Sequence, residues 1–292
     1  ESGDDTRRFA PPFLKDTEEK DTVESAYFTC ANRNKRSMTL DLNHPKGQIL
    51  AKRLIAECDV FTDNFKTGGL TKYGLDYDSL KDDFPHLVYC SITGFGHTGP
   101  YAKRPGYDVL IQAMGGFMSV TGDPSGEPQK AGIPVSDLIA GMYAGLAINA
   151  ALRHREVTGE GQFIDIGMLD TTAAILSIVG ANYLATGVIP ERIGNAHPNI
   201  VPYQSFPTAD GDIILAVGND GQFERFCNFA ECPELFTDKR FATNADRVKN
   251  RETLIPTLRK IISHKPSNFW LEGLEANNVS CGPINRLDQV FN

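Results

Sequence analysis

The 292 residues are enough for one large domain, or for a large domain with a smaller companion. The net charge of −8, without a basic stripe that carries interleaved aromatic residues, argues against nucleic acid as a partner. The six cysteines are scattered, with no C-x-x-C pair and no histidine at zinc spacing. We therefore expect neither a disulfide framework nor a metal site. A reducing compartment suits such a chain best.

The first third of the chain alternates between strand and helix patterns. The expected elements are an irregular arm at 1–26, a strand at 37–42, a helix from Pro45 to 57, a strand at 58–62, a helical piece at 77–84 and a strand at 87–92. The order strand, helix, strand, helix, strand predicts an α/β fold with a parallel sheet and right-handed crossovers.

Ligands of such sheets gather beyond the carboxyl ends of the strands. Three loops are expected there, after Leu42, at 64–69 and at 93–101. Lys66 and Lys72 bring cations that suit phosphates, and the glycines of these loops let backbone N–H groups approach a ligand. No dinucleotide or triphosphate motif is present, and a solvated basic turn is the alternative for each lysine.

An apolar helix is predicted to begin near Asp137. Pro134 and Ser136 prevent an earlier start, so Asp137 falls in the first turn, where backbone amides have no partner within the helix. These amides and the helix dipole favour the ionised carboxylate, and Gly141 and Gly145 leave space beside it. We expect Asp137 to be a nucleophile facing a cleft; the alternative is an acid that only caps a buried helix.

The run Leu138–Leu152 is too short for a comfortable membrane span and contains Asn149, so it is predicted to be a buried helix. Asp170, at the next strand-to-helix junction, is a rival catalytic acid or an N-cap.

The further expected elements are a strand at 162–166, a helix from 170 to 184, a strand at 212–217 after the turn Asp210-Gly211, and helices at 222–230, 251–263 and 266–276. We predict a large domain over 1–185, a linker and active-site loop over 186–201, and a small α+β domain over 202–292.

An ionised aspartate needs no general base to attack an activated acyl group, so the constellation suits an acyl-aspartyl intermediate. Loop amides near Gly194 and Asn195 are candidates to stabilise the oxyanion. His197 lies in the same loop, either closing on the site or as a bystander. Serine hydrolase chemistry is not supported, because there is no G-x-S-x-G elbow.

Several motifs in order resemble the class III CoA-transferases, the formyl-CoA transferase and CaiB/BaiF family. The resemblance extends through nearly the whole chain and rests on Asn32–Ser37 with Leu40–Leu42, Asp63–Phe65, Tyr89–Gly96, Gly106–Asp108, Asp137 with its glycine-bearing helix, Thr158–Gln162 and Gly194–Pro198. It implies a Rossmann-like large domain and an interlocked homodimer.

The resemblance also implies the reaction, which moves CoA from an acyl-CoA to a free carboxylic acid. Asp137 is then the nucleophile, through a mixed anhydride and an aspartyl-CoA thioester, and Asp170 is structural. The implied CoA contacts are Leu40 and Asn43 near the adenosine, Asn64, Phe65 and Lys66 near the phosphates, Lys72, and Tyr107 and Asp108 near the thioester. The loop with Gly194, Asn195 and His197 takes the place of the family's glycine loop over the reacting centre.

The substrates implied are an acyl-CoA and an acid, with succinyl-CoA and a small dicarboxylate as first expectation; no cofactor is held permanently and no membrane is involved. Bacterial cytoplasm or mitochondrial matrix suits this chemistry. The chain departs from the family in having Lys66-Thr67 for Arg-Pro, which keeps the charge but loses a rigid fork. Its loop over the reacting centre is poorer in glycine than that of formyl-CoA transferase, which weighs against formate or oxalate. The family's opening strand–helix–strand and returning C-terminal segment are absent, so we expect an incomplete copy of a longer protein.

Two other functions stay open. An α-methylacyl-CoA racemase has the same fold, but it places a histidine where this chain has Tyr107. Tyrosine, with an ordinary pKa near 10, is a poor acid/base group at neutral pH, which favours the transferase. The third alternative is a non-catalytic CoA-binding protein.

Overall fold

The computed structural model of the protein describes residues 3–291. The chain forms two compact units, one of Glu1–Pro105 with Met142–Ile166 and the other of Gly106–Gly141 with Gly167–Asn292. Helix α5 (Val135–Thr158) contributes residues to both. The predicted domains, 1–185 and 202–292 joined by 186–201, are a different division of the chain and stay a prediction.

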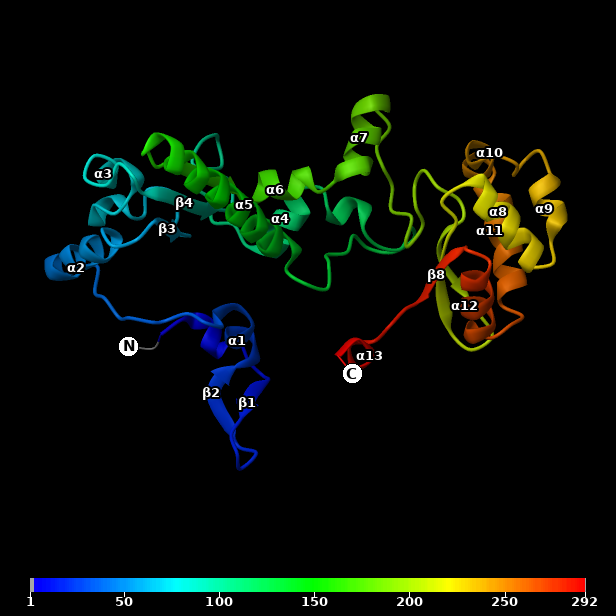
Figure 1. Cartoon of the computed structure of the whole chain (residues 1–292), viewed down its shortest axis with the longest axis horizontal. Helices are drawn as coiled ribbons and strands as arrows, with labels where there is room; N and C mark the ends of the chain where they lie inside the picture. Colours follow the sequence, from blue (N-terminus) through cyan, green and yellow to red (C-terminus); the bar gives the residue numbers. More distant parts are fainter. Residues whose placement is uncertain (1–2, 292) are drawn as a thin grey trace. The chain divides into compact units, whose positions relative to one another are not determined.

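In the first unit, two of the predicted strands pair in parallel (Figure 1). Val60 of β3 (Val60–Asp63) lies opposite Val88 of β4 (Val88–Thr93) in a parallel register, and β5 (Phe163–Gly167) neighbours β4. Helix α2 (Pro45–Ile55) begins with proline at its first turn, as predicted, because a missing N–H costs nothing there. The further elements are η1 (Asp5–Arg8), β1 (Phe13–Lys15), β2 (Asp21–Ser25), α1 (Ala26–Asn32), η2 (Thr71–Tyr73) and α3 (Tyr77–Leu80).

Two predictions for this unit are wrong. Residues 37–42 form no strand in the described chain, although Leu40 and Leu42 do pack on the apolar cluster with Ala51. Their alternation reflects two half-buried leucines that pack on this cluster, with no strand beside them among residues 3–291. The expected irregular arm contains the antiparallel pair β1 and β2, followed by α1.

The second unit contains an antiparallel sheet in the order β6 (Tyr203–Pro207), β7 (Asp212–Ala216) and β8 (Ser280–Pro283). The predicted turn closes where the Thr208 N–H donates to the Gly211 carbonyl at 2.8 Å. Helix α11 (Arg251–Ile262) packs on β6, and α12 (Ser267–Ala276) packs on β7 and β8 (Figure 1). The buried core between them includes Trp270. The further helices are α4 (Asp108–Met114), η3 (Met118–Val120), α6 (Met168–Ala174), α7 (Ser177–Thr186), α8 (Asp220–Phe229), α9 (Pro233–Thr237), α10 (Asn244–Lys249) and α13 (Leu287–Phe291).

Helix α5 starts where the sequence predicts, with Asp137 in its first turn. The prediction that its apolar run is buried is wrong for the described chain, since Leu138, Met142 and Leu146 are 50%, 69% and 73% exposed. By length and composition α5 could cross a membrane, as could α6 and α7 together. These two helices replace the single helix predicted from 170 to 184 and are bent by 77°.

Candidate active site

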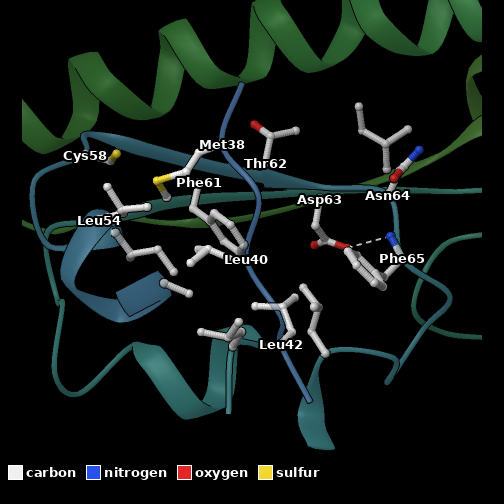
Figure 2. A pocket seen from close by; sticks show the side chains of 15 residues that line it. Met38, Leu40, Leu42, Leu54, Cys58, Phe61, Thr62, Asp63, Asn64 and Phe65 are labelled. Atoms are coloured by element: carbon white, nitrogen blue, oxygen red, sulfur yellow. Dashed lines mark hydrogen bonds between the residues drawn. The ribbon is translucent and has the colours of Figure 1, made fainter. Parts of the chain in front are cut away.

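An apolar cavity of about 660 Å³ lies in the first unit, at the carboxyl end of β3. Figure 2 shows the side chains of Leu40, Leu54 and Phe61 gathered around it, with Asp63, Asn64 and Phe65 at one end. Its lining is Met38, Leu40, Leu42, Ala51, Leu54, Ile55, Cys58, Phe61, Thr62, Asp63, Asn64, Phe65, Leu70, Leu75 and Ile92. Such a lining suits a flat or apolar ligand group, with few polar atoms to orient it.

The turn after β3 is fixed by its own residues. The Asp63 carboxylate accepts the Phe65 N–H at 2.9 Å (dashed in Figure 2), which turns the chain out of the sheet. The Gly69 N–H then donates to the Lys66 carbonyl, and a Cβ at Gly69 would come within 2.8 Å of that oxygen. The close approach requires glycine, and it holds Asn64 and Phe65 at the rim of the cavity.

The predicted CoA contacts of this unit fall into two groups. Leu40, Asn64 and Phe65 line the cavity. Asn43 and Lys72 meet at Tyr73, whose hydroxyl lies 3.2 Å from Asn43 Oδ1 and whose ring centroid lies 4.6 Å from Lys72 Nζ. Lys66 is exposed in the turn itself. An apolar cavity with exposed cations beside the same turn has the composition that a nucleotide with phosphates needs.

Asp137, the predicted nucleophile, lies in the second unit and is exposed. The prediction that the first backbone amides of α5 interact with the Asp137 carboxylate is wrong, because these amides donate to another acid. Asp108 Oδ1 accepts the Ser136 N–H at 2.8 Å and the Asp137 N–H at 3.3 Å. Within residues 3–291 no hydrogen bond to the Asp137 carboxylate is formed. Asp108 therefore caps the helix and leaves the Asp137 carboxylate open to a ligand.

The electrostatics of Asp137 follow from this arrangement. Desolvation of the carboxyl, and then the negative charge of Asp108, raise the pKa of Asp137 above its ordinary value. The sequence predicted the opposite influence, a helix terminus that favours the anion. A carboxylate with a raised pKa is a more basic and hence stronger nucleophile while it remains ionised.

Asp108 is itself held from behind by residues that sequence reasoning missed. Asp108 Oδ2 accepts the Gln112 side-chain amide at 2.6 Å, and Gln112 Oε1 accepts the Ala131 N–H at 2.8 Å. The hydroxyl of Thr172 donates to the Ser136 hydroxyl at 2.8 Å. Gln112, Ser136 and Thr172 are fully buried. The spacing of four between Asp108 and Gln112 was the one signal in the sequence, since such residues meet on a helix face.

The other predicted residues of this unit lie apart from that network. Tyr107 is the N-cap residue of α4 and is 74% exposed. Asp170 lies in the first turn of α6, whose N-cap residue is Gly167, so the N-cap role predicted for Asp170 is wrong. The Gly194 N–H, predicted as an oxyanion donor, donates to the Gly122 carbonyl at 3.0 Å.

The loop around His197 is ordered by local contacts. The His197 N–H donates to the Tyr203 carbonyl at 2.9 Å, and the two rings lie 5.2 Å apart. The Asn195 side-chain amide donates to the Ser205 hydroxyl at 3.2 Å. Desolvation, and then the charge of Arg251, lower the pKa of His197. A neutral imidazole is therefore favoured in this loop.

The protein thus combines an α/β fold with an apolar cavity large enough for a nucleotide. In the first turn of α5 it also has the Asp137 carboxylate, which accepts no hydrogen bond within residues 3–291. The family model described as CoA-transferase family III matches residues 1–292. The chain is 48% identical over 295 residues to the succinate–glutarate CoA-transferase of Agrobacterium fabrum, covering 100% of this chain and 72% of that protein. It is 41% identical over 290 residues to the human succinyl-CoA:glutarate CoA-transferase, and this match covers 99% of this chain and 65% of the human protein.

A solved structure of a CaiB/BaiF family protein from Brucella suis matches with a TM-score of 0.83 and 49% identity, over 99% of this chain and 76% of that one. The chain belongs to CoA-transferase family III. The predicted resemblance, the α/β fold and the enzyme class, a CoA-transferase, are confirmed. The chain spans between 65% and 76% of the length of these three relatives.

Proposed function

We propose that this protein transfers CoA from succinyl-CoA to a second small dicarboxylate, with Asp137 as the covalent nucleophile. The names of the two relatives above, both succinate or succinyl-CoA and glutarate enzymes, support this choice of donor and acceptor. The observation that carries the proposal is the exposed Asp137 carboxylate, whose helix amides are already occupied by Asp108.

The first half of the reaction exchanges CoA onto the enzyme. An oxygen of Asp137 attacks the thioester carbon of succinyl-CoA, the carbon–sulfur bond breaks, and CoA leaves as thiolate. The thiolate then attacks Cγ of Asp137 in the mixed anhydride, which releases succinate and leaves an aspartyl-CoA thioester.

The second half repeats these steps in reverse with the acceptor. The acceptor carboxylate attacks Cγ of Asp137 and expels CoA thiolate, forming a new anhydride. The thiolate attacks the acyl carbon of the acceptor, which yields the product acyl-CoA and restores the Asp137 carboxylate. No proton is gained or lost over the cycle, so the enzyme needs no general base.

The first unit supports CoA binding in this proposal. The 660 Å³ cavity with Leu40 takes the adenine ring, while Phe65 and Lys66 at its rim, and Lys72, serve the phosphates. We place Tyr107 near the thioester, and the loop of Gly194, Asn195 and His197 over the reacting centre. Coenzyme A is a substrate in this scheme and not a resident cofactor.

The wider setting is part of the proposal as well. We place the enzyme as a homodimer in bacterial cytoplasm or mitochondrial matrix, without nucleic acid or membrane. The reducing environment expected from the scattered cysteines supports this setting.

The test is trapping of the intermediate. Incubation with succinyl-CoA and hydroxylamine is expected to convert Asp137 to a hydroxamate that peptide mass spectrometry locates, and Asp137→Asn is expected to abolish both the adduct and CoA transfer. Asp170→Asn is the matched control, since Asp170 is also an exposed acid in the first turn of a helix of the same unit. Transfer at the native rate by Asp137→Asn would refute the proposal.

The alternatives give different products. A racemase would wash deuterium from solvent into the α-carbon of a 2-methylacyl-CoA without any acceptor acid. A binding protein would retain CoA but form no hydroxamate. Tyr107 in place of histidine argues against the racemase, and the exposed Asp137 carboxylate argues against a protein that only binds CoA.

A further inference from the structure

The second half of the active-site loop is held by arginine and asparagine side chains from α10 and α11. Arg251, the first residue of α11, donates from Nη2 to the Pro198 carbonyl at 2.7 Å and to the His197 carbonyl at 3.3 Å. Both acceptors are backbone atoms, so Arg251 fixes the path of the loop, while the His197 ring accepts the Asn199 N–H at 3.1 Å and packs against Tyr203. Charge-assisted hydrogen bonds of this kind are stronger than neutral ones.

Two further side chains continue this attachment along the chain. Asn244 donates to the Asn199 carbonyl at 2.8 Å and accepts the Val201 N–H at 3.1 Å. Arg247 donates from Nε to the Val201 carbonyl at 2.7 Å. Residues 197–201 are thus bound through their backbone by three side chains that follow one another at spacings of three and four.

The first half of the loop is attached to a different segment. The Gly194 N–H donates to the Gly122 carbonyl at 3.0 Å, and Arg192 donates to the Gly126 carbonyl at 2.7 Å. Asn195, between the two attachments, is exposed. Asn195 and His197 contact Ser205 and Tyr203, so the middle of the loop is held as well, and its position depends on these contacts and on both ends.

Arg251 differs from Arg247 in its burial and in its partners. Arg247 is fully buried and pairs with Asp220 at 2.7 Å, which makes it part of the core. Arg251 is only half-buried and forms no ion pair within residues 3–291. Its hydrogen bonds in the described chain go to the loop, so its removal disturbs the loop more than the core.

We propose that Arg251 is a positioning residue that holds the 194–199 loop over the covalent intermediate and keeps water from it. The inference rests on the proposed function, because it assigns that loop to the reacting centre. A loop held in place favours attack by the bound acceptor acid. A loosened loop admits water, which attacks the acyl-aspartyl or aspartyl-CoA carbonyl and hydrolyses succinyl-CoA to succinate and CoA.

The experiment compares CoA transfer with hydrolysis in the full-length protein. Succinyl-CoA is supplied with and without glutarate, and both products are quantified for the native protein, Arg251→Ala and Arg251→Lys. We expect Arg251→Ala to lower kcat for transfer roughly tenfold or more, as misplaced active-site groups do, to change KM for succinyl-CoA less than about twofold, since uniform binding is intact, and to raise the ratio of hydrolysis to transfer. Lysine offers one compact charge for two carbonyls and should give an intermediate ratio.

The matched control is Arg225→Ala. Arg225 also donates to two consecutive backbone carbonyls, those of Asn277 at 2.9 Å and Asn278 at 3.1 Å, in the same unit but away from the loop. A general loss of folding lowers transfer and hydrolysis together and leaves their ratio unchanged, so the ratio separates positioning from structure. If Arg251→Ala does not fold, Arg251→Lys carries the same test.

The outcomes are separable. Normal transfer by the native protein with the same ratio for Arg251→Ala, Arg251→Lys and Arg225→Ala would overturn the role of Arg251 and leave the proposed function standing. A native protein that transfers no CoA would overturn the proposed function and this inference with it.

Discussion

The hydrogen-bond network behind Asp137 predicts a specific result for Asp108→Asn. Asparagine keeps an oxygen for the Ser136 N–H but turns an NH₂ group toward the Gln112 amide, which donates to Asp108 at 2.6 Å. A flip of the Gln112 amide repairs this contact and then places NH₂ against the Ala131 N–H, which Gln112 accepts at 2.8 Å. One donor is left without an acceptor in either arrangement.

The magnitude follows from burial. Gln112 is fully buried, so water cannot replace the lost acceptor. An unpaired buried donor costs about 1–3 kcal/mol, and we expect Asp108→Asn to lower the free energy of unfolding by that amount. Gln112→Glu alone places a second carboxylate against Asp108 and should cost about 3 kcal/mol or more.

The double exchange, Asp108→Asn with Gln112→Glu, restores every pairing. The amide of the introduced asparagine donates to one oxygen of the introduced glutamate, and the other glutamate oxygen accepts the Ala131 N–H. The double variant should therefore lose less stability than the sum of the two single losses, and the difference, the coupling energy, should be about 1–3 kcal/mol.

The assay is urea unfolding followed by far-UV circular dichroism for the four members of the cycle. Asp123→Asn is the control, because the Asp123 carboxylate accepts from the Ser125 N–H and hydroxyl in an exposed turn, where water can replace it, and its replacement should change stability by no more than about 0.5 kcal/mol. Additive single effects, with a coupling energy near zero, would refute this account of the network.

Three further results are expected. Gly161→Ala should destabilise the protein by about 1–3 kcal/mol in thermal unfolding, because its Cβ would lie 2.1 Å from the Leu87 carbonyl oxygen. Arg247→Ala should cost about 1–3 kcal/mol in urea unfolding for each buried carbonyl that loses its donor, because the Val201 and Phe241 carbonyls lose the buried guanidinium. The charge of Asp108 is the second cause, after desolvation, of the raised pKa of Asp137, so Asp108→Asn should lower that pKa and move the acidic limb of kcat/KM to lower pH.

Each of these has a contrary outcome. Gly141→Ala, whose Cβ would meet no atom within 4 Å apart from the neighbouring helix backbone, is the control for Gly161→Ala, and equal melting temperatures would refute the predicted clash. An Arg247→Ala protein as stable as the native one would show that its carbonyl contacts are replaceable. An acidic limb that moves to higher pH, or stays in place, would contradict the influence of Asp108 on Asp137.

Elements with strong local signals could be predicted from the sequence. Pro45 marks the start of α2, the turn at Asp210-Gly211 joins β6 to β7, and Pro134 with Ser136 determines where α5 begins. These signals depend on residues within a few positions of one another. Local steric and hydrogen-bonding preferences are then sufficient.

Features that depend on distant partners could not be predicted. The alternation at 37–42 does not say whether another strand lies beside it, and in the described chain none does. The acid that caps α5 is Asp108, 29 positions before Asp137, so the sequence placed the helix start correctly but assigned the wrong partner to its amides. Arg251 was missed for the same reason, since its carbonyl acceptors are backbone atoms of a remote loop.

The position of Trp270 gives this protein a built-in optical reporter. It is the only tryptophan in the sequence, and it lies in the buried core between α8, α12 and the β6–β8 sheet. Its emission therefore senses that core and no other, whereas circular dichroism averages over the whole chain. A denaturation curve recorded by both signals would reveal whether the region of the apolar cavity and the C-terminal region melt as one cooperative body or in succession.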